Sequence, residues 1–503
     1  MRACDKQIKR AKWMERVLCF FESKYFAPVL AVFTFIIQLL GLDIFGFVAL
    51  ALAFSFVCVF GNSTNACIPI LCMAIFCVST QNSPFDIASA FQGVENGEVI
   101  MGEPSTYYAS PLFIICALVF GTLLAAAIVY RLVKHADYAR VFSGKGLFFG
   151  IAAMAVSFLL AGYGVNFAWH NFIYGAIQAA TFLFVYIFFA ATLDFKTFSL
   201  DYLAETMIWS MIHVIVLVGY IYLTRFKYFM QFDGIWKGYM VAGWGLSLDF
   251  GSYIAMLLPA CFYRIAKTKK HVVWWILLVV LAYITLYFTL ARGAILFASL
   301  SGLLALVMGL RSKRLRKPII GVLIAVGVAL VALLVALVQM GILEWFIAAY
   351  LKGEGDISNG RLDIWSRFTD YFFRYPLFGG GFSVDLDAGY TIYEIGVLTI
   401  YSSLAHSTIY QFMGSCGIFG LWAFYEHCLS IVKMFDRGTK RKRLFLLPVL
   451  FCFFGMSMLD TLFFKAHYTF FYIIVLLVCE AEVRKNEKPT LKERIKAYSR
   501  EIV

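Results

Sequence analysis

One histidine stands where it could act as a base. His406 follows Leu404 and Ala405 at the end of a long polar segment and opens an apolar stretch. Histidine is the usual general base near neutral pH, because its charge changes in that range. A histidine at a helix end, satisfied by a backbone carbonyl, is the structural alternative, and taken alone the residue favours it. His406 is therefore a candidate catalytic residue whose role depends on its neighbours.

A single arginine interrupts an otherwise apolar stretch. Arg292 lies between Ala291 and Gly293, within residues 272–310. A charged side chain in a membrane segment is costly and is a functional candidate for that reason. An interfacial arginine that extends to lipid headgroups is the alternative. We favour function, because Gly293 allows a ligand or a helix to approach closely.

Further charges and an aromatic ring cluster in the long polar segment before His406. Arg361, Asp363, Trp365 and Arg367 follow one another within seven residues. A guanidinium offers a planar fork of donors that matches phosphate oxygens, and a tryptophan near a membrane surface suits a sugar or a lipid. A solvated ion pair between Arg361 and Asp363 is the simpler interpretation of this motif alone.

The remaining polar residues give weaker indications. Several lie in or near apolar stretches, where they could line a cavity, but bonding between helices is the more common role: Gln178, Glu205, His213, Asp249 and Asp460. The seven histidines show no metal-ligand spacing, and the 12 cysteines form neither a zinc cluster nor a dense disulfide pattern. The sequence therefore predicts no metal site and no cofactor. The run Gly379 to Gly381 lacks the context of a phosphate loop and predicts a tight turn after Pro376.

The composition is that of a membrane protein. Of 503 residues, 62% are hydrophobic and 15% are charged. A soluble domain has roughly 45–50% apolar and about 25% charged residues. A soluble core of this length could not hide so much apolar surface, which excludes an ordinary soluble enzyme.

Hydropathy predicts an all-α membrane protein with about fourteen transmembrane helices, each needing roughly 20 apolar residues. Arg292 and Gly293 divide residues 272–310 into two of these spans. The expected spans centre near Phe35, Phe54, Ala74, Leu118, Met154, Ala180, Val216, Ala255, Leu281, Ser301, Val328, Trp422, Phe453 and Ile474.

The basic residues predict the orientation. With the N-terminus in the cytoplasm, 34 of the 43 lysines and arginines fall on inner segments, as the positive-inside rule requires. Nine fall outside, among them Arg292, Arg361 and Lys465. The net charge of +13 therefore reflects topology and contact with lipid headgroups, and it requires no nucleic acid.

The same pattern divides the chain into five segments. We expect a cytoplasmic basic N-terminus at 1–24, a membrane domain with spans 1–11 at 25–340 and a long extracytoplasmic loop at 341–405. A second membrane part with spans 12–14 follows at 406–483, and a cytoplasmic amphipathic tail at 484–503. Within the loop, residues 360–375 predict a short amphipathic helix, because Ile364, Phe368, Tyr371 and Phe372 share a face. A structureless loop of this length is uncommon unless it is functional.

The central third of the chain resembles the O-antigen ligase and polymerase family of bacterial membrane glycosyltransferases. Over residues 270–430 the parts stand in the family's order: a span pair split at Arg292, an arginine followed by a tryptophan (Arg361, Trp365), and Ala405 with His406 opening the next span. Between the last two comes the family's proline and glycine motif, here Pro376, Leu377, Phe378, Gly379, Gly380, Gly381 and Phe382. Two positions depart from the family: Ala291 stands where serine is frequent, and Ser407 where asparagine is usual.

The resemblance implies a glycosyltransferase C-like fold in the bacterial cytoplasmic membrane and transfer of a polyprenyl-diphosphate-linked glycan. Because the sequence shows no dedicated set of metal ligands, we expect this transfer to need no metal. The implied catalytic residues are His406 toward the acceptor hydroxyl or the leaving group, and Arg292 and Arg361 on the diphosphate. Trp365, Arg367 and Asp363 would bind substrate. The acceptor would be a glycan for a polymerase, which the span count favours slightly, or a lipid or protein for a ligase. Polysaccharide assembly proteins are the expected partners.

Two other classes stay open. A lipid-linked glycan flippase or other transporter would also have about a dozen spans, but it predicts internal repeats and polar residues near the midplane. No convincing repeat is present, and the candidates fall at the outer surface. A non-catalytic scaffold of the cell envelope ranks last.

Overall fold

The computed structural model describes most of the helical part of the chain. The described residues are 12–74, 76, 91–95, 98–101, 111–142, 147–165, 167–194, 200–226, 240–242, 245–268, 271–310, 361–382, 391–395, 398–402, 405–437, 440–484 and six single positions between 316 and 339. The expected span near Val328, the first eleven residues and the tail after residue 484 lie largely or wholly outside these residues.

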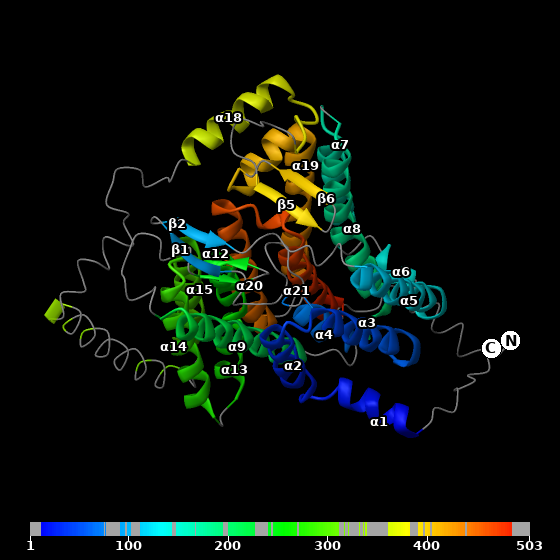
Figure 1. Cartoon of the computed structure of the whole chain (residues 1–503), viewed down its shortest axis with the longest axis vertical. Coiled ribbons are helices and arrows are strands. Elements are labelled where there is room, and N and C mark those ends of the chain that lie inside the picture. The colour runs from blue at the N-terminus through cyan, green and yellow to red at the C-terminus, as the bar shows by residue number, and fades with distance from the viewer. Residues whose placement is uncertain are drawn as a thin grey trace.

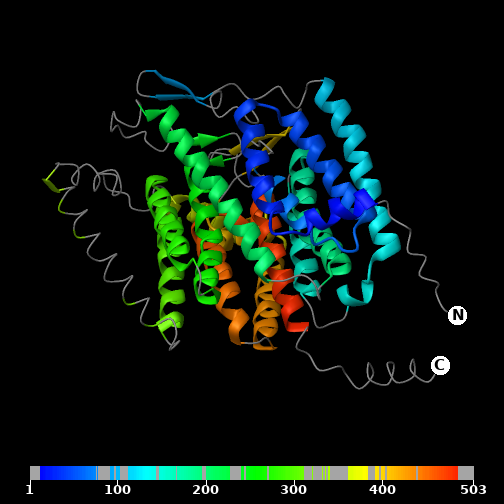
Figure 2. The ribbon, with the colours of Figure 1, turned by 90° about the horizontal axis from the view of Figure 1, so that it is seen from below.

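Helices dominate the fold and gather into one bundle, in which they run side by side (Figures 1 and 2). The first half of the chain contributes α1 (Lys12–Phe21), α2 (Phe26–Leu40), α3 (Asp43–Phe60), α4 (Cys67–Ala74), α5 (Pro111–His135), α6 (Tyr138–Val141), α7 (Phe148–Tyr163), α8 (Trp169–Thr192) and α9 (Leu200–Thr224). The second half contributes α12 (Ser247–Leu257), α13 (Pro259–Lys267), α14 (Val272–Phe288), α15 (Arg292–Leu310), α18 (Arg361–Arg374), α19 (Thr408–Arg437), α20 (Lys440–Leu459), the short 3-10 helix η4 (Leu462–Phe464) and α21 (Ala466–Arg484).

Among the residues that the structure describes, three short antiparallel hairpins accompany the helices, and the sequence did not predict them. They are β1 (Phe91–Glu95) with β2 (Glu98–Met101), β3 (Val241–Ala242) with β4 (Gly245–Leu246), and β5 (Thr391–Ile395) with β6 (Leu398–Ser402). Each joins two helices, and β6 packs near α8.

The helices have the length and composition of a membrane protein. Among the described residues, four helical stretches are long and apolar enough to cross a membrane, and a fifth counts if α1 and α2, bent by 83° to each other, form one span. The four are Pro111–His135, Asn171–Thr192, Leu200–Thr224 and Thr408–Met434. Six shorter apolar helices accompany them. The predicted helical membrane protein is confirmed at this level, whereas the count of fourteen spans stays a prediction.

The helices differ in how deeply they are buried. α5 lies at the edge of the bundle, with only 6% of its apolar stretch buried (Figure 2). By contrast, α7 packs against α8 and α19, and α21 packs against α8 and α19. There α7 and α8 approach so closely that a Cβ on Gly162 would lie 3.1 Å from the Cα of Gly175, the small-residue packing common between membrane helices. Aromatic rings fill the core, with Phe453 stacked on Tyr472 at 4.3 Å.

Candidate active site at the start of α19

His406 is held in an uncommon backbone conformation just before α19. Its φ is +48°, a left-handed value that a residue with a side chain rarely adopts. The preceding residue fixes it from two sides: the Ala405 amide donates to Gln411 Oε1 at 2.7 Å, and the Ala405 carbonyl accepts from Trp365 Nε1 at 2.8 Å. Such strain costs about 1–3 kcal/mol and persists where neighbouring contacts hold it. The His406 side chain is 42% exposed, so a substrate can reach it.

A buried carboxylate lies beside this histidine. His406 Nδ1 is 3.7 Å from Asp460 Oδ1, and Asp460 occupies the turn between α20 and η4. The Thr461 amide donates to the same carboxylate oxygen at 2.7 Å. Burial alone would raise the Asp460 pKa, but Lys465, His406 and the Thr461 amide together bring it well below its usual range. Asp460 is therefore an anion at neutral pH.

Lys465 ties Asp460 to a second buried carboxylate. Its ammonium lies 3.0 Å from Asp460 Oδ2 and 3.5 Å from Asp249 Oδ1, which comes from α12. Tyr468, one turn into α21, donates to Asp249 Oδ1 at 2.7 Å. Two segments far apart in sequence, α12 and the stretch from Asp460 to Tyr468, thus meet behind His406. The sequence reading favoured structural roles for Asp249 and Asp460 and counted Lys465 only toward topology.

Arg292 begins α15 at a sharp break after α14. Leu290 has a φ of +52°, and the Ala291 amide donates to Thr289 Oγ1 at 3.3 Å, so the apolar stretch divides here as predicted. Gly293 faces the end of α20, where a Cβ would lie 3.2 Å from Leu459 Cδ1. Leu459 directly precedes Asp460, so the half-buried Arg292 starts its helix next to the turn that carries the carboxylate.

The predicted amphipathic helix is present as α18 and lies at one end of the bundle, against α19 (Figure 1). Phe368 is buried against Ala405, with Ile364, Tyr371 and Tyr410 packed around them. The Trp365 ring stacks on Tyr410 at 4.8 Å. Arg361 is half-buried at the first position of α18, one turn before Trp365, while Asp363 and Arg367 are exposed. The structure therefore places Trp365 against the backbone of Ala405, the residue before His406. Arg361 lies one turn before Trp365 on the same helix.

Residues 276–425 match the O-antigen ligase family. The chain carries an O-antigen ligase domain. The matched segment runs from α14 into α19 and contains Arg292, Arg361, Trp365 and His406, which confirms the family expected from the sequence. A comparison with curated proteins finds no match.

Asp460 and the residues linked to it lie outside the matched ligase segment. Asp249 precedes it, and Asp460, Lys465 and Tyr468 follow it. The sequence could have pointed to Asp460 and Asp249 as functional residues, because each is a polar residue at the end of an apolar span. For Lys465 and Tyr468 the sequence offered no comparable sign.

The proline and glycine motif of the ligase domain forms backbone hydrogen bonds to α19 where that helix is interrupted. Gly417 has a φ of +63° and a non-helical ψ, so the helix is interrupted there. The amides of Gly380 and Gly381 donate to the carbonyls of Gly414 and Ser415, at 2.8 and 3.1 Å. The amides of Ile418 and Phe419 donate to the carbonyls of Pro376 and Leu377, at 2.7 and 3.1 Å. The motif thus replaces the lost helical bonds, and the predicted turn after Pro376 is confirmed.

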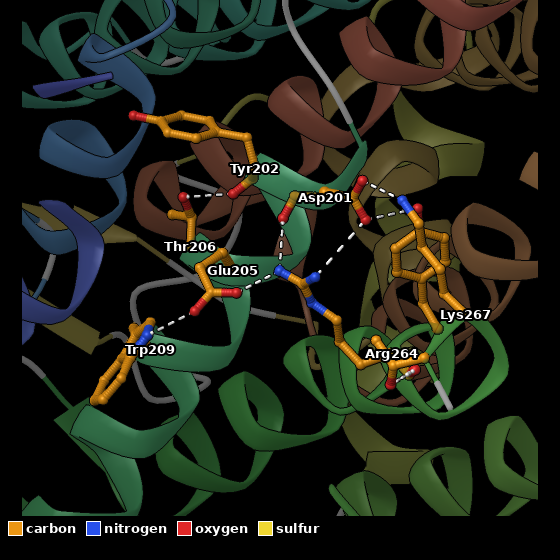
Figure 3. A network of polar contacts seen from close by, with 9 residues as sticks. Asp201, Tyr202, Glu205, Thr206, Trp209, Arg264 and Lys267 are labelled. Atoms are coloured by element: carbon orange, nitrogen blue, oxygen red, sulfur yellow. Dashed lines mark hydrogen bonds and ion pairs between the residues drawn. The ribbon is translucent and has the colours of Figure 1, made fainter. Parts of the chain in front are cut away.

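Another polar network links α9 and α13, which precede the matched residues in sequence. Figure 3 shows Arg264 pointing at Glu205 and at the Asp201 carbonyl, while Lys267 pairs with the Asp201 carboxylate. Trp209 donates to Glu205 Oε1 at 3.0 Å. These contacts join two helices, as the structural interpretation of Glu205 expects. His213 and Gln178 likewise contact backbone carbonyls, at 3.2 Å from Ala31 and 2.6 Å from Phe464.

Proposed function

We propose that the protein transfers a polyprenyl-diphosphate-linked glycan to an acceptor glycan, as a cell-surface polysaccharide polymerase. The observation that carries the proposal is the pairing of the accessible His406 with the buried Asp460 at the start of α19. An O-antigen ligase domain supplies the chemical context, because its Ala-His motif falls on Ala405 and His406. The reaction needs a base for a weak nucleophile, and an imidazole beside a carboxylate meets that need.

His406 takes the proton of the acceptor hydroxyl as the acceptor oxygen bonds to the anomeric carbon of the donor glycan. The bond from that carbon to the diphosphate oxygen breaks, and the lipid diphosphate leaves with the electron pair. Asp460 stabilises the imidazolium that forms. Because His406 is partly exposed, its proton can then pass to water.

The arginines would act on the leaving group. Negative charge builds on the diphosphate as its bond to the sugar breaks, and preorganised cations stabilise that charge strongly where water is scarce. Arg292, beside the turn that carries Asp460, and Arg361, on the helix that packs against Ala405, are placed to contribute. We assign sugar contacts to Trp365 and to the exposed Asp363 and Arg367. The scheme uses no metal.

We place the reaction on the extracytoplasmic side of the bacterial cytoplasmic membrane. The distribution of lysine and arginine supports this orientation, because 34 of 43 fall on the segments assigned to the cytoplasm. Both termini are then cytoplasmic. The donor must reach this face before the reaction, so a separate step has to move the lipid-linked glycan across the membrane.

A ligase is the second candidate, since the matched family is described by that activity. A ligase would pass the same donor glycan to a lipid or protein, with the same roles for His406 and the arginines. A flippase would move the donor without changing it.

Reconstitution separates these functions. The purified protein is placed in vesicles with a lipid-linked repeat unit, and the glycan length is measured. A polymerase lengthens the glycan, and a ligase leaves it unchanged until its acceptor is added. Movement of an unaltered glycan across the bilayer would contradict both proposals and favour a flippase.

A further inference from the structure

The charged cluster behind His406 extends beyond Asp460. Asp249 and Lys465 are both largely buried, with side chains 11% and 15% exposed. They come from α12 and from the start of α21, and neither lies within the matched ligase segment. Burying two such charges costs free energy, and a buried ion pair adds little to the stability of a fold. Because these two lie next to a candidate base, we considered a role in the reaction.

Lys465 is shared between two carboxylates. Its ammonium is 3.0 Å from Asp460 and 3.5 Å from Asp249, so each carboxylate limits how strongly Lys465 can pair with the other. Asp249 is itself held in place. It accepts a hydrogen bond from Tyr468, whose ring stacks on Tyr253 of α12 at 4.9 Å.

We propose that Asp249 and Lys465 are positioning residues for His406, acting through Asp460. This inference rests on the proposed role of His406 as the base. Asp249 shares the Lys465 ammonium with Asp460, so Lys465 neutralises the Asp460 carboxylate only in part. The Asp460 carboxylate can then stabilise the imidazolium that forms when His406 takes the acceptor proton. Neither residue touches the substrate in this arrangement.

Neutralising Asp249 should therefore lower the rate of chemistry. In Asp249→Asn the amide oxygen can still accept from Tyr468, so the fold is preserved. Of its two carboxylate partners Lys465 then keeps only the charge of Asp460, so it pairs with Asp460 more strongly and this carboxylate is less available to His406. We expect kcat to fall about tenfold with little change in KM. A change of this size is typical of the energetic coupling between residues in one salt-bridge network.

The double variant gives the sharper test. Lys465→Met leaves Asp249 and Asp460 with no cation between them, and their repulsion displaces the Asp460 carboxylate from its place beside His406, so we expect a larger loss of kcat. Adding Asp249→Asn to Lys465→Met restores the local charge, so the double variant should be about five- to tenfold more active than Lys465→Met alone. A purely structural role would make the two losses add or worsen, without rescue.

The matched controls come from the α9–α13 network. Asp201→Asn and the pair Asp201→Asn with Lys267→Met remove a more exposed ion pair that joins α9 to α13 and involves neither His406 nor Asp460, and kcat should stay near wild type. Glycan lengthening is measured as kcat and KM on purified full-length protein in vesicles. Wild-type kcat in Asp249→Asn, or no rescue in the double variant, would overturn the inference. If His406→Ala is itself active, the proposed base is wrong, which is a separate outcome.

Discussion

The indole of Trp365 donates a hydrogen bond to the carbonyl of Ala405, the residue immediately before His406, at 2.8 Å. This contact joins α18 to the start of α19. Because Gln411 holds the Ala405 amide at the same time, the backbone on the N-terminal side of His406 is fixed at both of its polar atoms. The helix that carries Arg361 thus also sets the position of the candidate base.

Replacing Trp365 by phenylalanine tests this relationship. Phe keeps a ring to stack on Tyr410 but cannot donate to Ala405, so the strained backbone at His406 loses one support. We expect kcat to fall about two- to tenfold, the effect of one net hydrogen bond. The control is Trp209→Phe, which removes an indole bond to Glu205 on α9. Equal activity of the two variants would argue against a role for the Trp365 contact.

Asp460→Asn tests the carboxylate beside His406. The amide keeps the size of the side chain but loses the charge that favours an imidazolium. We expect kcat to fall about a hundredfold with a smaller change in KM, comparable to losing one preorganised electrostatic contact. Asp201→Asn, on the α9–α13 network, should retain activity. An Asp460→Asn protein that folds and works at the wild-type rate would remove Asp460 from the mechanism.

The lowered pKa of Asp460 also predicts a pH effect on stability. A carboxyl group whose pKa is lower in the folded than in the unfolded protein stabilises the fold above its unfolded pKa, about 3.9, and this contribution is lost as the pH falls toward the folded value. Wild type should thus be more stable than Asp460→Asn at neutral pH, and the difference should shrink below about pH 4. Thermal unfolding of both proteins in detergent across pH measures this, and a pH-independent difference would contradict it.

Gly379 should be indispensable for joining the glycine motif to α19. Its φ is +72°, and a Cβ there would lie 2.3 Å from the Ser415 carbonyl carbon. We expect Gly379→Ala to destabilise the protein by at least about 2 kcal/mol, from backbone strain and the clash. Gly121→Ala on α5 is the matched control, since no atom lies within 4 Å of its added Cβ. Unfolding temperatures that fall equally in both variants would refute this prediction.

Local patterns predicted much of the candidate site. An arginine and a glycine inside an apolar stretch marked the break between α14 and α15, because a charge rarely continues a membrane span. The spacing of Ile364, Phe368 and Tyr371 predicted α18, since residues three and four apart share a helical face.

The surroundings of His406 were not predictable in the same way. Asp249, Asp460 and Lys465 reach it only through the packing of α12, α20 and α21, and contacts between distant helices leave no periodic pattern in a single sequence. The hydrogen bonds between the segments around Gly380 and Gly414 could not be predicted for the same reason. Taken singly, each residue has a common structural role in the sequence, as an acidic residue at the end of a span or a glycine in a turn.

Removing the imidazole tests whether His406 is the base for glycan transfer. Purified wild type and His406→Ala are compared for glycan transfer from a lipid-linked repeat unit in vesicles, with EDTA present. We predict transfer by wild type in EDTA and a loss of about 10²- to 10⁴-fold in His406→Ala, the usual contribution of a general base. Near-wild-type transfer by a folded His406→Ala protein, or wild-type activity that EDTA abolishes and magnesium restores, would contradict the account.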